Sequence, residues 1–317
     1  MKRMINTEHI EGRIYQHNLE KKTVQNQASA NFGKEFISGN LEIAVDEAGL
    51  VVIPVHFTYI TETTSNGNKN ATYANLEKII NDNNTWITKG KDEATKVRID
   101  TALAVNDFYN RDDQLVTTKV NEGGFVSIVS ELCPENERNT FTVDMLITQA
   151  TRVSADPEKN IEKDYVVLKG AVFNFRNDLL PVDFIVRNEE GMDYFESLEV
   201  TNANPVLTKV WGRIDCRTLL NERKEETAFG EESVRTFERK IKEWIITGGA
   251  KVPYDFGDET VLTAAELTKA SQDRQLKLAD VKKRRDEYQA QKGAAAPTVS
   301  TSQSAPAVTV VKDTFTF

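Results

Sequence analysis

Five short segments of this chain place an aromatic ring close to a lysine or an arginine. Such pairing is typical of proteins that hold single-stranded nucleic acid, in which bases stack on aromatic faces while Lys and Arg contact the phosphates. The candidate residues are Phe32, Lys34, Phe36, Trp86, Lys89, Lys91, Phe108, Tyr109, Arg111, Phe173, Phe175, Arg176, Trp211 and Arg213. The segment Trp86–Lys91 is the best single candidate, because it is expected between a helix and a strand and carries two lysines and a glycine. Each ring taken alone is more often part of a core than a stacking platform.

One of these segments has a predictable geometry. Phe173 and Phe175 are two residues apart, so they should share one face of a strand. Arg176 should face the other way unless a turn redirects it.

Residues for the common catalytic chemistries are scarce. Three histidines (His9, His17 and His56) and two cysteines (Cys133 and Cys216) offer little for Ser-His-Asp or Cys-His catalysis. The cysteines have no CxxC partner, which argues against a disulfide framework and a cysteine-based zinc site. No GxSxG, GxxxxGK[ST], HExxH or GxGxxG motif occurs. Carboxylates are abundant, but no pattern pairs two of them as a glycosidase would. We therefore predict a protein that is not an enzyme and needs no cofactor or metal.

The formal net charge is −9, and it is unevenly distributed. The residues before Arg217 include 23 Lys and Arg against 33 Asp and Glu, whereas Arg217–Lys292 includes 16 and 15. A nucleic-acid site in the acidic part must therefore be a local patch that works against the overall field. No apolar run reaches the ~18–20 residues that span a bilayer, and no apolar signal region follows Met1. We expect a cytoplasmic protein without membrane contact.

The elements that must position these side chains are mostly strands. Alternating apolar and polar residues, rich in β-branched and aromatic types, predict two strand sets separated by turns. The expected strands are Gly12–His17, Phe36–Val45, Leu50–Ile60, Thr95–Val105 and Gln114–Val129, then Thr142–Arg152, Tyr165–Arg176, Leu179–Arg187 and Val206–Arg217. A pattern of Gly-x-[Leu/Val], turn, Leu, Pro-Val-x-Phe starts at Gly39 and again at Gly170. Duplication of one barrel and chance similarity between hairpins both explain it.

Helical spacing of apolar residues predicts three helices. The first covers Thr72–Asn81, and the second covers Gly230–Thr247, of which the end from Trp244 could instead be a strand. The third begins at a capping box, Thr263 to Glu266, and runs to about Gln291. Its basic run Lys282–Arg285 complements the helix dipole, or alternatively contacts nucleic acid.

The C-terminal residues 293–317 are predicted to be a disordered linker with an aromatic tip. Residues 293–306 are rich in Ala, Pro, Ser, Thr and Gln, a composition that cannot bury a core. The tip residues Asp313, Phe315 and Phe317 are candidates for capture by a partner protein. The segment Val308–Val311 could instead dock on the chain's own body as a strand.

This layout resembles a known family. A five-stranded barrel with a helix between its third and fourth strands, then a helix, a Pro/Ser/Gln-rich linker and a tip ending in Phe, is similar to single-stranded DNA-binding proteins with OB-folds. The phage-encoded members are the most similar. The resemblance implies a tip that recruits a replication or recombination protein. Asp313 and Phe317 match the acidic, Phe-terminated tips of the family, whereas Lys312, Thr314 and Thr316 depart from them.

We therefore expect a mainly β protein with C-terminal helices, built on one or two OB-like barrels. The expected division is 1–135 and 136–250 for two β-rich domains, 251–292 for a helical segment and 293–317 for the tail. The leading hypothesis is sequence-tolerant binding of single-stranded DNA. The chain could act as a homo-oligomer, and it is expected in the host cytoplasm if it is phage-encoded. The alternative is a phage structural or assembly protein, in which the strands, the long helix and the tail make subunit contacts.

Overall fold

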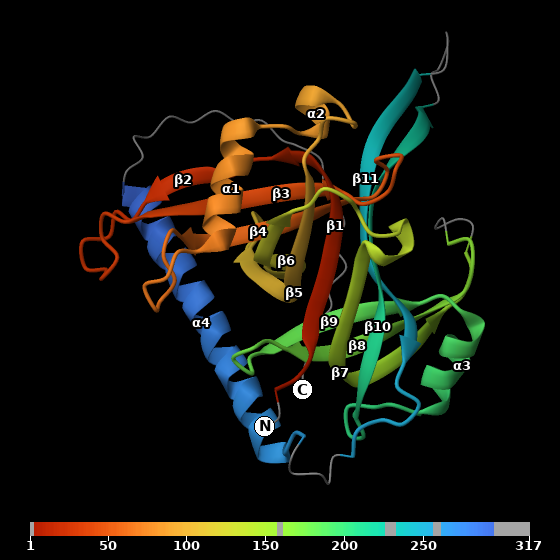
Figure 1. The fold of residues 1–317 in the computed structure, drawn as a ribbon. Helices are drawn as coiled ribbons and strands as arrows, with labels where there is room; N and C mark the ends of the chain where they lie inside the picture. Colours follow the sequence, from red (N-terminus) through yellow and green to blue (C-terminus); the bar gives the residue numbers. More distant parts are fainter. Residues whose placement is uncertain (1–2, 157–160, 226–232, 256–260, 295–317) are drawn as a thin grey trace.

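The computed structural model describes residues 3–156, 161–225, 233–255 and 261–294, and all side chains among them except those of 220–239 and 291–294. The strands form two closed circuits of five (Figure 1). The first contains β1 (Asn6–His17), β3 (Glu35–Ala44), β4 (Val52–Thr61), β5 (Lys96–Tyr109) and β6 (Leu115–Ile128). The second contains β7 (Asn139–Val153), β8 (Tyr165–Phe173), β9 (Leu179–Val186), β10 (Val206–Glu225) and β11 (Ser233–Gly249).

Both circuits have the strand order of an OB-fold. In the first barrel β1 pairs with β3 and β5, β3 with β4, β5 with β6, and β4 with β6 in parallel. In the second, β7 pairs with β8 and β10, β8 with β9, β10 with β11, and β9 with β11 in parallel. A helix follows the third strand of each circuit: α1 (Ala71–Asp82) in the first and α3 (Glu189–Ser197) in the second. The expected fold class is thus confirmed, with two barrels; the domain limits stay a prediction.

Local sequence explains why these strands close. In β4 the buried Ile53, Val55 and Phe57 alternate with outward residues such as His56, so one face lines the barrel core. Gly12 allows β1 to approach β3, because a Cβ at this position would lie 2.2 Å from the carbonyl oxygen of Ala44. The repeated Pro-Val-x-Phe pattern falls on β4 and on β9, the same strand of each barrel, and its Phe57 and Phe184 are both fully buried.

The barrels are joined by strand pairing and by their hairpins. Strand β1 of the first barrel also pairs with β7 of the second, from Asn6↔Val143 to Ile10↔Asn139. The β5–β6 hairpin reaches β9, where Lys119 Nζ lies 2.6 Å from Asp183 Oδ1. The β10–β11 hairpin reaches the first barrel, where Arg217 makes a bridge with Val51 beside β4. Each barrel therefore supports the long hairpin of the other.

The helix α4 (Ala264–Ala294) ties the two barrels together from outside (Figure 1). The predicted capping box is present, since Thr263 Oγ1 accepts from the Glu266 amide and the Glu266 carboxylate accepts from the Thr263 amide. Ala270 is buried in a cluster with Phe173 of the second barrel, and Arg274 binds Asp107 on the β5–β6 hairpin. No described helix is long and apolar enough to cross a lipid bilayer.

The helix expected over Gly230–Thr247 is wrong. Residues 233–249 form β11, which pairs with β10 over most of its length and with β9 at Ile245 and Ile246. This segment is a strand because the neighbouring strands β10 and β9 accept and donate the hydrogen bonds of its backbone. The spacing of apolar residues within the segment gives no information about these partners. Three short features were also missed: β2 (Glu20–Thr23), the 3-10 turn η1 (Glu135–Glu137), and α3, while Trp86 lies on a one-turn helix, α2 (Trp86–Lys89), and not in a loop. The tip residues lie outside the described residues.

Candidate nucleic-acid interface

A groove of about 500 Å³ opens on the outer surface of the first barrel. Its walls come from the barrel's own β3, β4, β5 and β6, and one residue of the second barrel, Lys242 on β11, also lines it. Most lining side chains are short or polar, among them Asn40, His56, Thr58 and Asn106. His56 Nδ1 and Asn40 Oδ1 lie 2.9 Å apart, which fixes the imidazole against β3. The groove is therefore open, and most of the side chains that line it are short or polar.

One end of the groove carries a pair of aromatic rings. Beyond Asn40 and Thr58, the same two strands bear Phe36 and Tyr59, whose ring centroids are 4.6 Å apart at an interplanar angle of 40°. Tyr59 is 41% exposed. A shift of register between Ile37 and Gly39 turns Tyr59 out of phase with the buried Phe57, so its ring reaches the surface.

The other end leads to the tip of the β5–β6 hairpin. Phe108 lies two residues beyond Asn106 on β5, so both side chains project from the same side of the strand. Phe108 is 40% exposed. The next ring, Tyr109, lies 5.1 Å from the guanidinium of Arg285 on α4, and Arg285 also binds Asp113 in the hairpin turn at 2.6 Å. The fold thus brings the predicted Phe108, Tyr109 and Arg111 to the basic run of α4.

That basic run supplies cations that are not already neutralised. Within the described part of the chain, Lys282, Lys283 and Arg284 are exposed and make no ion pair, and Arg111 makes none either. Tyr288, one turn beyond Arg284, is 63% exposed. We name Phe108, Tyr109 and Arg111, together with Lys282–Arg285 and Tyr288, the hairpin–helix surface. It combines rings with free positive charge.

Two lysines near the groove are held by protein groups instead. Burial lowers the pKa of Lys119, whose ammonium binds Asp183 and lies 4.8 Å from the ring centroid of Trp244. Burial also lowers the pKa of Lys242, whose ammonium donates to the carbonyl of Lys119. Both lysines fasten the β5–β6 hairpin to the second barrel, so they position the groove more than they attract phosphate.

The segment around Trp86 offers less than the sequence suggested. The ring packs 6.1 Å from that of Tyr15 and against Gly49, and it is only partly exposed. Lys91 lies 5.8 Å from this ring, but its ammonium is bound to the Glu47 carboxylate at 3.0 Å. Of the three candidates here, Lys89 alone is both exposed and without a described ion pair.

Three further candidate rings, Phe173, Phe175 and Phe32, do not line the groove. The expectation that Phe173 and Phe175 share one face of a strand is wrong, because Phe173 is fully buried at the end of β8 and Phe175 lies beyond the strand. β8 ends at Phe173, and the following turn leaves Phe175 65% exposed and redirects Arg176 to 5.0 Å from its ring. Phe32 is exposed in the loop after β2, where Lys34 donates to Asn31.

The last segment lies on the sheet that joins the barrels. Trp211 and Arg213 share the outer face of β10. Arg213 begins a row across five strands that continues through Thr140, His9 and Asp100 to Phe125, which is 77% exposed. Sequence reasoning missed Phe125, Tyr59 and Tyr288. Phe125 follows Gly123-Gly124, and Tyr288 lies near the end of an amphipathic helix. Neither local sequence distinguishes an exposed ring that can stack on a base from a ring buried in the core.

A family model matches residues 5–284 of the chain, which is most of its length. The chain belongs to the YorF family. The fold of this YorF protein is similar to that of the wild-type single-stranded DNA binding protein from Thermus aquaticus, with 12% identity, coverage of 80% of this chain and 95% of that chain, and a TM-score of 0.45. A deletion mutant of the same protein gives 12% identity, 82% and 100% coverage and a TM-score of 0.46. Single-stranded DNA-binding proteins, which the sequence resembles, are thus among the solved structures similar in fold to this chain. No curated protein matches the chain.

Proposed function

We propose that this YorF protein binds single-stranded DNA without sequence preference, along the groove of the first barrel. The observation that carries the proposal is the continuity of the surface. The Phe36–Tyr59 pair stands at one end of the groove, and the hairpin–helix surface with its rings and unpaired cations stands at the other. Base stacking on rings and Lys or Arg contacts to phosphate are the two interactions that single strands require.

The nature of the surface favours a single strand over a duplex. Exposed rings offer faces for stacking, which only unpaired bases can use, and every base has such a face. The His56 imidazole in the groove is already engaged with Asn40, which leaves His56 Nδ1 unavailable for reading base edges. Stacking without edge recognition makes the binding tolerant of sequence.

The charge distribution agrees with this placement. The first 216 residues are acidic overall, but apart from Arg111 the hairpin–helix surface takes its cations from α4, which lies in the near-neutral part of the chain. Arg285 of this run lies beside the Tyr109 ring of the hairpin, and the whole run raises the local positive potential there.

Fluorescence anisotropy of labelled oligo-dT tests the proposal. Replacing Phe36, Tyr59 or Phe108 with alanine should weaken binding by about 1–3 kcal/mol per ring. Phe175→Ala is a matched control, because it removes an exposed ring outside the groove. Charge removal at Lys282, Lys283 and Arg284 should flatten the salt dependence by roughly 0.7 per lost phosphate contact. Absence of oligo-dT binding at low salt would refute the proposal.

A role in replication or recombination, with the tail bearing Asp313, Phe315 and Phe317 as the recruiting segment, follows as a further part of the proposal. Deletion of residues 307–317 should leave oligo-dT affinity unchanged and abolish capture of a replication protein.

One observation favours the second candidate, a structural or assembly role: Phe125 is a large exposed ring on the face shared by both barrels. The structural role would be favoured if the protein forms a stable large oligomer that does not bind oligo-dT and that dissociates in the Phe125→Asp variant.

A further inference from the structure

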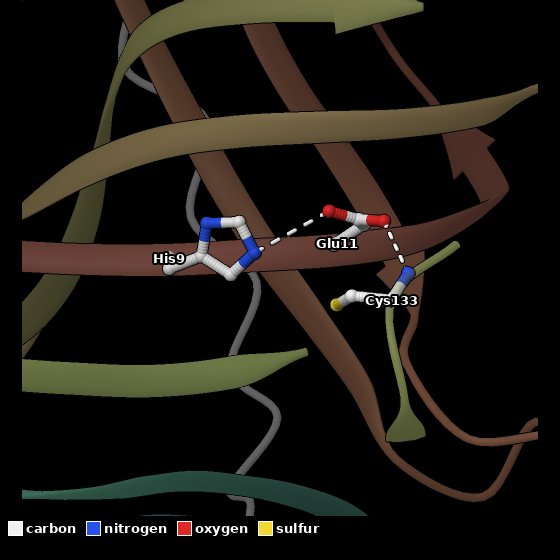
Figure 2. Close-up of side chains that lie close together, drawn as sticks. All are labelled: His9, Glu11 and Cys133. Atoms are coloured by element: carbon white, nitrogen blue, oxygen red, sulfur yellow. Dashed lines mark hydrogen bonds and ion pairs between the residues drawn. The ribbon is translucent and has the colours of Figure 1, made fainter. Parts of the chain in front are cut away.

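Three side chains of metal-binding type meet at the junction of the two barrels (Figure 2). His9 and Glu11 project from β1, and Cys133 comes from the connection between β6 and β7. One ligand atom from each lies within 4.8 Å of the others, and His9 Nε2 is 3.4 Å from Glu11 Oε2. Spacing along the sequence did not suggest this cluster, because Cys133 is more than a hundred residues away from both partners.

Neighbouring groups hold two of these ligands in place. Glu11 is fully buried; its Oε2 accepts from Arg98 Nε at 2.6 Å, and its Oε1 accepts from the Cys133 amide at 2.6 Å. His9 Nδ1 lies 3.7 Å from Asp100 Oδ1, so a carboxylate stands behind the imidazole whose Nε2 faces Glu11. A carboxylate behind the histidine is the arrangement that orients imidazoles at metal centres.

From this geometry we propose that His9, Glu11 and Cys133 bind one divalent, thiophilic metal ion, of which Zn²⁺ is the best match. Imidazole nitrogen, carboxylate oxygen and thiolate are the three ligand types of protein zinc sites, at about 2.0–2.3 Å from the ion. Ligands at such distances around a tetrahedral ion are roughly 3.3–3.8 Å apart. The 3.4 Å separation of His9 and Glu11 falls within this range, so a small movement of the Cys133 side chain completes the set. Water takes the fourth position.

The proton balance is simple. Burial raises the pKa of the Cys133 thiol, so the metal-free protein holds it as S–H. Metal binding exchanges this proton for the ion and releases the proton to solvent. The buried Glu11 already carries a negative charge, since its hydrogen bonds outweigh burial and lower its pKa.

The position of the cluster indicates a structural role. β1 is the one described strand that pairs with β3 and β5 of its own barrel and also with β7 of the other. Cys133 belongs to the crossing between the barrels, where its carbonyl also accepts from the buried Arg138. A metal ion would fasten this crossing to the shared strand. None of its ligands lines the groove, so the metal site and DNA binding can fail independently.

Cobalt and zinc titration of the full-length, metal-free chain tests the site. One equivalent of Co²⁺ should produce a thiolate-to-cobalt charge-transfer band and the visible bands of tetrahedral Co²⁺, and Zn²⁺ should abolish both. Cys133→Ser should remove the charge-transfer band and weaken Zn²⁺ binding more than tenfold. Asp100→Asn, which alters only the group behind His9, should weaken binding about 10- to 100-fold.

Cys216→Ser is the matched control, because Cys216 is the other cysteine and belongs to no such cluster among the described residues. It should leave the cobalt spectrum unchanged, and circular dichroism should show that all variants are folded. Two results would overturn the proposal: a wild-type chain that takes up no stoichiometric Co²⁺ or Zn²⁺, or a charge-transfer band that survives Cys133→Ser.

Discussion

Replacing Glu8 with glutamine should remove a large part of the pH dependence of folding stability between pH 5 and pH 8. Glu8 is buried on β1, where its carboxylate accepts from Trp244 Nε1 and Thr101 Oγ1, both at 2.8 Å. Burial raises the pKa of Glu8 from 4.5 to about 7, although both hydrogen bonds and the charge of Lys242 act in the opposite direction. Because Trp244 belongs to β11, this carboxyl group lies where the two barrels meet.

The sign and size follow from proton linkage. The folded state binds the Glu8 proton more tightly than the unfolded state does. The stability that it contributes is therefore complete below pH 4.5 and is lost as the pH rises through about 7. A shift from 4.5 to about 7 corresponds to about 3 kcal/mol in total, of which about 2.5 kcal/mol falls between pH 5 and pH 8. Glutamine resembles the neutral acid and can keep both hydrogen bonds, so it should not pay this penalty.

Urea unfolding of wild type and Glu8→Gln at pH 5 and pH 8 provides the measurement. The variant should gain about 3 kcal/mol over wild type at pH 8 and less than about 1 kcal/mol at pH 5. Comparison of the two proteins is needed because burial lowers the pKa of His17, which acts in the opposite sense and stabilises the fold as the pH rises. Glu131→Gln changes the net charge equally at an exposed position and should behave as wild type. If wild type and Glu8→Gln differ equally at both pH values, the buried-acid reasoning is wrong.

Three other substitutions address packing, each measured by urea or thermal unfolding. Arg274→Ala should lower the free energy of unfolding by about 3 kcal/mol and release α4 from the hairpin, because Arg274 and Asp107 form two hydrogen bonds and both side chains are only 10% exposed. Arg274→Lys should restore part of this loss. Unchanged stability of the alanine variant would contradict the prediction. Gly12→Ala should destabilise the first barrel by more than about 2 kcal/mol, since the new methyl group would lie 2.2 Å from a carbonyl oxygen; wild-type stability would show that β1 can move aside. Phe173→Ala should cost about 3–5 kcal/mol whereas Phe175→Ala should cost almost nothing, and equal losses would contradict their assigned burial.

Sequence alone determined the features that depend on neighbouring residues. The alternation in β4 and the β-branched runs of β7 to β9 identified strands within a few residues, because a half-buried strand shows period two wherever it packs. The capping box at Thr263 located the start of α4, since its hydrogen bonds lie within one helical turn. The same reasoning identified Phe108, Tyr109 and Arg111 as a group, although not their neighbours on α4.

Tertiary structure decided whatever depends on residues far apart in the chain. β11 is a strand because β10 and β9 lie beside it, despite apolar residues at helical spacing. Phe173 is buried in the core, and Tyr59 lies at the surface because of the register shift between β3 and β4. Neither outcome follows from the residue types near these positions. The groove, the hairpin–helix surface and the cluster of His9, Glu11 and Cys133 exist only because barrel closure brings distant strands together. Local patterns report which face of an element is apolar, whereas a site needs contacts between elements, and these arise only when the chain folds.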